Sequence, residues 1–221
     1  MDISQYATLI FDCDGVVLNS NKIKTAAFYN AARPYGVNAA EALVEYHKKN
    51  GGISRYTKFE YFLKNIVKTK LEQLELDLLL ENYAYEVRDG LLYCQISPGL
   101  ENLRKATQSR WLIVSGGDQN ELRSIFSQRN LMEDFNGGVF GSPDTKDTIL
   151  LRELENGNIN LPALFIGDSK YDYQAAKVNN IDFVFAYDWT ELVNWKEYCK
   201  KNDLRVISNI SNLNTVVPEN T

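Results

Sequence analysis

Short apolar runs alternate with helical patterns along most of the chain. Four runs of four apolar residues, each bounded by turn-forming residues, predict buried strands at 8–11, 111–114, 163–166 and 183–186. A brief extended piece is predicted at 138–141. Helices are predicted between these pieces at 119–128, 146–155 and 171–178. Repeated strand–helix units of this kind predict a parallel sheet with helices on both faces.

The stretch between about residues 21 and 90 has a different pattern. Apolar residues recur there at helical spacing in four segments, at 22–32, 40–49, 58–67 and 71–87. Glycines such as Gly51-Gly52 separate these segments, and no convincing strand interrupts them. We therefore expect a doubly wound, Rossmann-like α/β core, split after its first strand by an all-helical insertion. The expected limits are 1–17 and 92–221 for the core and 18–91 for the insertion.

Composition narrows the classes of function. The 221 residues are 44% hydrophobic and 24% charged, with a net charge of -5, which argues against a general nucleic-acid binder. An anionic substrate is still compatible, because a bound divalent cation can reverse the local field. Three scattered cysteines suggest no disulfide framework. No apolar run is long enough for a membrane span and the first residues are polar, so we expect a cytoplasmic protein of open oligomeric state.

Three polar residues directly follow predicted strands. Asp12, Ser115 and Asp168 hold these positions, and Lys146 opens a helix in the same series of units. Ligands of open α/β sheets bind beyond the carboxyl ends of the strands, and we expect the four residues to meet at that rim.

Each motif has an ordinary structural explanation beside a chemical one. Asp12 and Asp14 end a strand in a turn, but they are also suited to be a nucleophile and a proton carrier. Ser115-Gly116 is common turn chemistry, but a hydroxyl and free N–H groups can grip phosphate oxygens. Lys146 is either a solvated surface lysine or a charge that neutralises a carboxylate and a phosphoryl group.

Asp168 and Asp172 follow the third predicted strand four residues apart. They are either a helix cap with an exposed neighbour or a pair of ligands for a hard cation such as Mg²⁺. The chain has one histidine, His47, which lies in the helical insertion. This weakens a Ser-His-Asp or a histidine–metal hydrolase. A carboxylate nucleophile is the remaining option.

Taken together, the motifs resemble those of the haloacid dehalogenase-like superfamily. The resemblance is to its phosphatase branch with a helical cap after the first motif, which includes phosphoglycolate phosphatase and β-phosphoglucomutase. The matching segments are Phe11-Asp12-Cys13-Asp14-Gly15, Ile113-Val114-Ser115-Gly116, Lys146 and Gly167-Asp168-Ser169-Lys170-Tyr171-Asp172. Order and spacing match over nearly the whole chain.

The resemblance implies a Mg²⁺-dependent phosphatase that acts on a small phosphomonoester, such as a sugar phosphate. Asp12 would be the nucleophile that forms an aspartyl-phosphate, and Asp14 would protonate the leaving group and then activate water. Ser115 and the Gly116 amide would hold the phosphoryl oxygens, and Lys146 would pair with Asp12 and the phosphate. The implied metal residues are Asp12, Asp14 through its carbonyl, Asp168, and Asp172 in a supporting position.

The helical insertion would close over the site as a cap. Its Gly51–Arg55 loop resembles the cap loop of β-phosphoglucomutase, so Arg55 is a candidate substrate-binding residue. Lys24, however, stands where those mutases carry a histidine. A phosphomutase is therefore the alternative, and a non-enzymatic receiver-like phosphoprotein is a weaker one, because receivers lack such an insertion. The dehalogenases of the family lack an acid at the position of Asp14, which makes dehalogenation an unfavourable reading.

Two positions depart from the familiar patterns. Asn19 stands where many relatives carry an acid in the hinge to the cap. Lys146 is followed by Asp-Thr, where phosphoglycolate phosphatase-like members often have Lys-Pro-x-Pro. The natural substrate is therefore not assigned.

Overall fold

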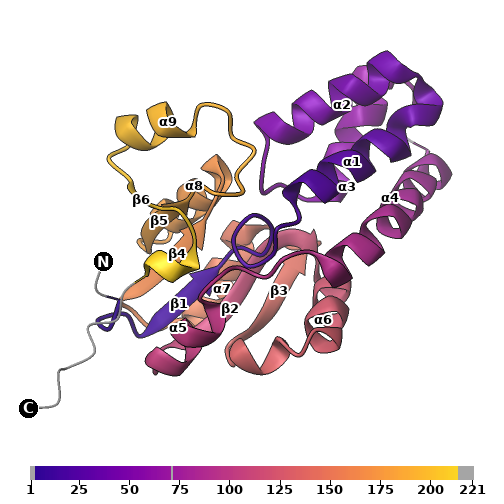
Figure 1. Ribbon diagram of the computed structural model, residues 1–221. Helices are drawn as coiled ribbons and strands as arrows, with labels where there is room; N and C mark the ends of the chain where they lie inside the picture. Colours follow the sequence, from indigo (N-terminus) through magenta and orange to yellow (C-terminus); the bar gives the residue numbers. More distant parts are fainter. Residues whose placement is uncertain (1–2, 71, 214–221) are drawn as a thin grey trace, which may run out of the picture.

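A parallel β-sheet forms the centre of the molecule. In the computed structural model, which describes residues 3–70 and 72–213, the sheet has six strands in the order β3-β2-β1-β4-β5-β6 (Figure 1). The strands are β1 (Thr8–Phe11), β2 (Arg110–Asp118), β3 (Gly138–Ser142), β4 (Ala163–Gly167), β5 (Asp182–Ala186) and β6 (Arg205–Ile207). Every neighbouring pair is parallel, which confirms the predicted doubly wound class. The strand order reverses between β1 and β4, so a crevice is expected at their carboxyl ends.

Helices cover both faces of the sheet because alternate strand residues point to opposite sides. On one face Ile10, Leu112 and Phe165 pack against α7 (Lys146–Glu155) and α8 (Lys170–Val178). On the other face, strand residues Phe11, Trp111 and Ile113 belong to the same core as α5 (Leu100–Ala106) and α6 (Gln119–Gln128). The central strands are therefore buried on both sides, as their continuous apolar runs predict.

Of the five α-helices that the structure describes between β1 and β2, the first four form the cap (Figure 1). They are α1 (Asn21–Ala32), α2 (Val37–Lys49), α3 (Arg55–Tyr61) and α4 (Gln73–Tyr93), with a π-helical turn at Phe62–Val67. Phe28 of α1 packs against α3 and α4, because its ring centroid lies 5.2 Å from that of Phe59 and 4.4 Å from that of Tyr83. The helix predicted at 71–87 begins at Gln73 and continues to Tyr93, and Leu71 lies outside the described residues. The predicted cap limit at residue 91 falls in the last turn of this helix, and the domain limits stay a prediction.

Several elements were not predicted. They are α5, α9 (Trp195–Lys201), β6 and the 3₁₀ turns Arg33–Tyr35, Met132–Asp134 and Ile210–Asn212. Each is short, and β6 has only one buried residue, Ile207. Such elements carry too few apolar positions to set a period. Within the described ranges, no helix is long and apolar enough to cross a membrane.

Candidate active site

Asp12 lies directly after β1 and is 3% exposed. Its Oδ1 accepts a hydrogen bond of 2.7 Å from the N–H of Cys13. The Nζ of Lys146 lies 2.9 Å from the same oxygen and also forms an ion pair with Asp172. Lys146 is 1% exposed and opens α7, where the Thr145 side chain caps the helix. The lysine is therefore a buried bridge between two carboxylates rather than a solvated surface residue.

Asp168 and Asp172 lie where β4 passes into α8. Asp172 Oδ2 accepts hydrogen bonds from the N–H groups of Asp168 at 3.2 Å and Ser169 at 3.0 Å, and Ser169 and Asp172 form a capping box. Asn21, the first residue of α1, donates a hydrogen bond of 2.7 Å to Asp168 Oδ2. One carboxylate oxygen from each of Asp12, Asp168 and Asp172 lies within 4.8 Å of the others. The sheet thus brings together the acidic motif after β1 and the acidic motif after β4.

The cluster of Asp12, Asp168 and Asp172 has more negative than positive charge. Burial raises the pKa of Asp12 to about 7; Lys146 opposes the shift, and Asp172 adds to it. Burial, followed by the charges of Asp12 and Asp172, raises the pKa of Asp168 well above its ordinary value. Although burial opposes it, the two carboxylates raise the pKa of Lys146. Three buried acids therefore share one ammonium, and a divalent cation would restore the balance.

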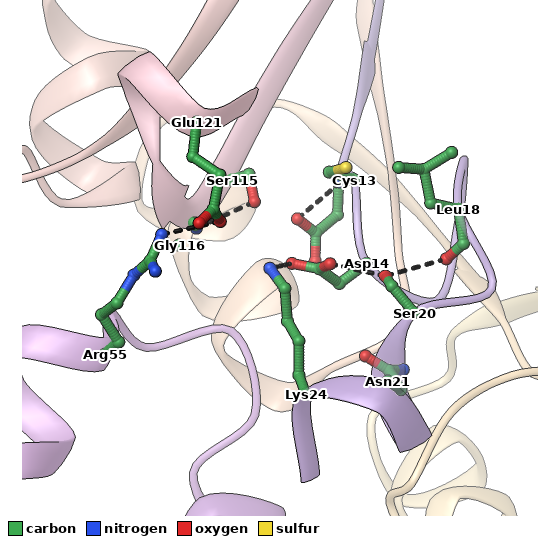
Figure 2. Close-up of polar contacts among 12 residues, drawn as sticks. Cys13, Asp14, Leu18, Ser20, Asn21, Lys24, Arg55, Ser115, Gly116 and Glu121 are labelled. Atoms are coloured by element: carbon green, nitrogen blue, oxygen red, sulfur yellow. Dashed lines mark hydrogen bonds and ion pairs between the residues drawn. The ribbon is translucent and has the colours of Figure 1, made fainter. Parts of the chain in front are cut away.

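Asp14 is held by residues at the start of α1 (Figure 2). Lys24 Nζ lies 2.6 Å from its Oδ2, and the Ser20 hydroxyl donates a hydrogen bond of 2.6 Å to its Oδ1. Burial favours the neutral acid, but Lys24 and Ser20 outweigh it and lower the pKa of Asp14. The resting form of this side chain is a carboxylate.

Ser115 and Gly116 lie within β2 rather than after it. The predicted strand ends at residue 114, but β2 continues to Asp118 with a register shift against β3 after Val114. Ser115 is fully buried, and its hydroxyl accepts a hydrogen bond of 3.0 Å from the N–H of Gly117. β2 continues through the predicted turn at Ser115–Gly117, because Asp118 pairs with Ser142 of β3 after the register shift.

A narrow pocket of about 40 Å³ lies between core and cap. Its lining contains Asp12, Asp14 and Gly116 from the core and Lys24 and Arg55 from the cap. The described lining does not include Ser115. Asp12, Asp14 and Gly116 therefore share one pocket. Asp168 and Asp172 do not line it, but each has a carboxylate oxygen within 4.8 Å of one from Asp12.

The cap loop lies directly on the core. A Cβ atom added to Gly116 would lie 2.1 Å from the carbonyl oxygen of Gly52, so the two backbones touch. Arg55 lines the pocket, but its Nη2 lies 2.7 Å from Glu121 Oε1 on α6 (Figure 2). The neighbouring Tyr56 donates a hydrogen bond of 2.8 Å to Asp118. The Gly51–Arg55 loop therefore contacts the site, and the assignment of Arg55 as a substrate ligand stays a prediction.

Lys58 and His47 also line the pocket, and neither was predicted to do so. Lys58 is 2% exposed, and its Nζ lies 2.8 Å from Nδ1 of His47. Lys58 follows Arg55 by three residues on α3, so the two share one helix face. This three-residue spacing is the sequence signal that could have identified Lys58 as a pocket residue. The pairing with His47 joins two helices, and no local pattern reveals it.

One protein family matches most of the chain. The model of the family "Haloacid dehalogenase-like hydrolase" matches residues 9–186. The search of curated proteins gives no match.

Solved structures with the same fold include three from bacteria. A β-phosphoglucomutase from Clostridium difficile is 20% identical, with a TM-score of 0.74, over 95% of this chain and 93% of that chain. A predicted phosphatase from Clostridium acetobutylicum is 19% identical, with a TM-score of 0.70, over 92% and 94% of the two chains. A predicted phosphoglycolate phosphatase from Haemophilus somnus is 15% identical, with a TM-score of 0.69, over 95% and 96%. With its fold and the family match over residues 9–186, the chain belongs to the haloacid dehalogenase-like hydrolases.

Proposed function

We propose that the protein is a Mg²⁺-dependent phosphatase that hydrolyses a small organic phosphomonoester through an aspartyl-phosphate on Asp12. The observation that carries the proposal is the buried ion pair of Lys146 with Asp12, beside the carboxylate of Asp168 at the carboxyl ends of β1 and β4. A phosphoryl transition state is stabilised mainly by alignment and by neutralisation of charge. This arrangement supplies a nucleophile and a fixed positive charge in one buried site.

The first step is attack of a carboxylate oxygen of Asp12 on phosphorus. Oδ1 already accepts hydrogen bonds from Cys13 and Lys146, so we assign Oδ2 to the attack. The bond from phosphorus to the ester oxygen breaks, and the leaving alcohol takes a proton from Asp14. Because the resting form of Asp14 is the carboxylate, it first takes up this proton from the bound phosphate monoanion or from solvent. The Gly116 amide and the Ser115 hydroxyl are the proposed donors that hold the phosphoryl oxygens.

The second step is hydrolysis of the aspartyl-phosphate. The carboxylate of Asp14 takes a proton from water, the water oxygen bonds to phosphorus, and the carboxylate of Asp12 leaves. Inorganic phosphate is released. Lys24 and Ser20 favour the carboxylate form of Asp14, which is the form that this step needs.

The oxygen atoms of the aspartate cluster are ligands of the kind that Mg²⁺ prefers. Asp12, Asp168 and the carbonyl of Asp14 are the proposed ligands, and Asp172 supports them, because its oxygens already bind Lys146, Ser169 and the backbone. Mg²⁺ prefers one or two carboxylates with water and phosphate oxygens. When bound, the metal supplies positive charge to the transferring phosphoryl group.

A screen for phosphate release from a panel of small phosphomonoesters in Mg²⁺ tests the proposal. Wild-type protein should release phosphate with turnover, and the Asp12→Asn variant should not. No release from any compound, p-nitrophenyl phosphate included, overturns the proposal and favours a receiver-like protein. With a sugar phosphate, an isomeric sugar phosphate as product instead of inorganic phosphate identifies a phosphomutase.

A further inference from the structure

Lys58 is a buried lysine that faces the candidate active site from the cap. It lies on α3 and lines the same pocket as Asp12 and Asp14. Its Nζ lies 5.3 Å from the ring centroid of Phe28 and 2.8 Å from Nδ1 of His47. The ammonium therefore contacts the imidazole of His47 and lies beside the ring of Phe28, at the wall of the space that a substrate would enter.

The charge of Lys58 is not balanced by the protein. Lys24 pairs with Asp14, Arg55 with Glu121, and Lys146 with Asp12 and Asp172. Among residues 3–70 and 72–213, no carboxylate oxygen lies within 4.0 Å of Lys58 Nζ. A buried charge is costly unless it is paired. An anionic group on the ligand would supply the missing partner.

His47 directs the ammonium without neutralising it. Burial and the charge of Lys58 lower the pKa of His47 well below its ordinary value, so the ring is neutral. With Nδ1 as acceptor from Lys58, the other nitrogen carries the proton and faces Glu191 Oε2 at 3.8 Å. An ammonium has three N–H donors, and His47 takes one of them. Within residues 3–70 and 72–213 no other hydrogen bond of this ammonium is found, so two donors remain for ligand oxygens.

We propose that Lys58, oriented by His47, binds a second anionic group of the substrate, so that the preferred substrates are phosphomonoesters that also carry a carboxylate or a second phosphate. The inference rests on the proposed function, because it names the substrate class of that same site. Burial and the charge of Lys24 lower the pKa of Lys58 to about 7, so an anion beside it would also stabilise its charged form.

Matched substrate pairs test the proposal. Phosphoglycolate is compared with 2-hydroxyethyl phosphate, and propane-1,3-diyl bisphosphate with 3-hydroxypropyl phosphate, so that each pair differs in the second anion. Wild-type protein should have the higher kcat/KM for the anionic member of at least one pair. Lys58→Met should reduce that preference by about 10- to 100-fold, the range expected for a lost hydrogen bond to a charged group. Lys58→Arg should retain more of the preference than Lys58→Met.

Lys64→Met is the matched control, since Lys64 lies in the following turn with 51% of its side chain exposed. It should keep the wild-type preference. Far-UV circular dichroism and thermal melts verify that each variant is folded. Absence of preference in wild-type protein, or an equal loss by Lys58→Met for both members of a pair, overturns the proposal.

A binding measurement separates this proposal from the proposed function. In the Asp12→Asn background, phosphoglycolate should raise the melting temperature more than 2-hydroxyethyl phosphate does, and Lys58→Met should remove the difference. If that result is obtained and wild-type protein releases no phosphate, the anion subsite stands and the phosphatase proposal fails. If phosphate is released but neither binding nor turnover depends on the second anion, the subsite fails alone.

Discussion

The ammonium of Lys24 lies 2.6 Å from Oδ2 of Asp14, so the first cap helix directly holds an acid of the core (Figure 2). Both partners are largely buried, with side-chain exposures of 9% and 16%. Lys24 is also part of α1, and any movement of α1 away from the core would release the carboxylate. The position of the cap and the charge state of Asp14 are thus linked through this pair.

Lys24→Met should slow turnover by about 10- to 100-fold, less than the full contribution of a general acid–base group, because Asp14 itself remains. Rapid-quench measurement of the two steps should place the larger effect on hydrolysis of the aspartyl-phosphate, which needs the Asp14 carboxylate. Lys22→Met, at an exposed position of the same helix, is the control. An equal slowing by both variants would remove the assigned role of Lys24.

Arg55 has two possible roles that a double-mutant cycle distinguishes. If Arg55 acts through Glu121 to hold the cap on α6, then Arg55→Met and Glu121→Gln should each raise KM. The double variant should lose little more than either single variant, with a coupling free energy of about 1–3 kcal/mol. If Arg55→Met costs as much in the Glu121→Gln background as in wild type, Arg55 contacts the substrate instead.

The contact of Gly116 with Gly52 predicts a strong effect of one added methyl group. Gly116→Ala would place Cβ 2.1 Å from a carbonyl oxygen of the cap loop, so the loop or the strand must move. A displacement near 1 Å can cost about 10² in rate, and kcat/KM should fall by about 10-fold or more. Gly51→Ala is the comparison, because its Cβ would meet only the Ser169 side chain at 3.3 Å. A larger loss for Gly51→Ala than for Gly116→Ala would contradict this reading.

Mg²⁺ should stabilise the fold as well as support activity. At about 100 times its Kd a ligand contributes about 2.7 kcal/mol, and calorimetry should show a higher Tm with Mg²⁺ than with EDTA. Asp168→Asn should abolish most of that shift and reduce activity by about 10²-fold or more. In EDTA the variant should melt above wild type, because one of three crowded acids is neutral.

Asp203→Asn provides the surface control for this experiment, since Asp203 is exposed and far along the chain from the acidic motifs. Asparagine also tolerates its left-handed backbone, at a φ of 52°. An unchanged Mg²⁺ shift in Asp168→Asn would show that the metal binds elsewhere.

The core of the site was predictable because strand ends can be read locally. The apolar run before Asp12 and the one before Asp168 each mark a buried strand, and the parallel topology places their carboxyl ends side by side. The helical pattern of the insertion was equally visible, since four stretches keep a period of 3.6 residues. The family motifs then singled out Lys146. The polar residues around it in the sequence would otherwise suggest a solvated surface lysine.

The contacts between cap and core, and those between helices of the cap, were not predictable in the same way. The pairs Arg55–Glu121 and Lys58–His47 join residues 66 and 11 positions apart, and polar residues at these positions look the same whether solvated or buried. The continuation of β2 through Ser115 was missed because Ser-Gly-Gly has the composition of a turn. Tertiary pairing with β3 overrides that local preference.

The preference for a second anion should depend on pH through Lys58. Its pKa in the folded protein is about 7, lowered chiefly by burial and then by Lys24. Below that pH the ammonium can bind an anion, and above it the neutral amine binds one weakly. The charged and titratable groups that face it from neighbouring elements are Lys24, His47, Asp14, Lys146 and Glu191.

The ratio of kcat/KM for phosphoglycolate to that for 2-hydroxyethyl phosphate should therefore fall as pH rises through about 7. Taking the ratio cancels the titration of Asp14 and of the shared phosphate group, and kcat/KM reports the free enzyme. Lys58→Met should have a low and flat ratio. A ratio that falls equally in the variant would assign the titration to another group.

Folding stability gives an independent check with a defined sign. An unfolded lysine titrates near 10.5 and Lys58 in the folded protein near 7, so between these values the unfolded chain binds more protons. This group therefore makes the free energy of unfolding rise as pH increases from about 7 to 10.5. Urea denaturation of Lys58→Met should lack that rise relative to wild type, while Lys64→Met should keep it. A rise of the same size in Lys58→Met would mean that Lys58 is charged throughout this range, and the predicted loss of preference near pH 7 would then be wrong.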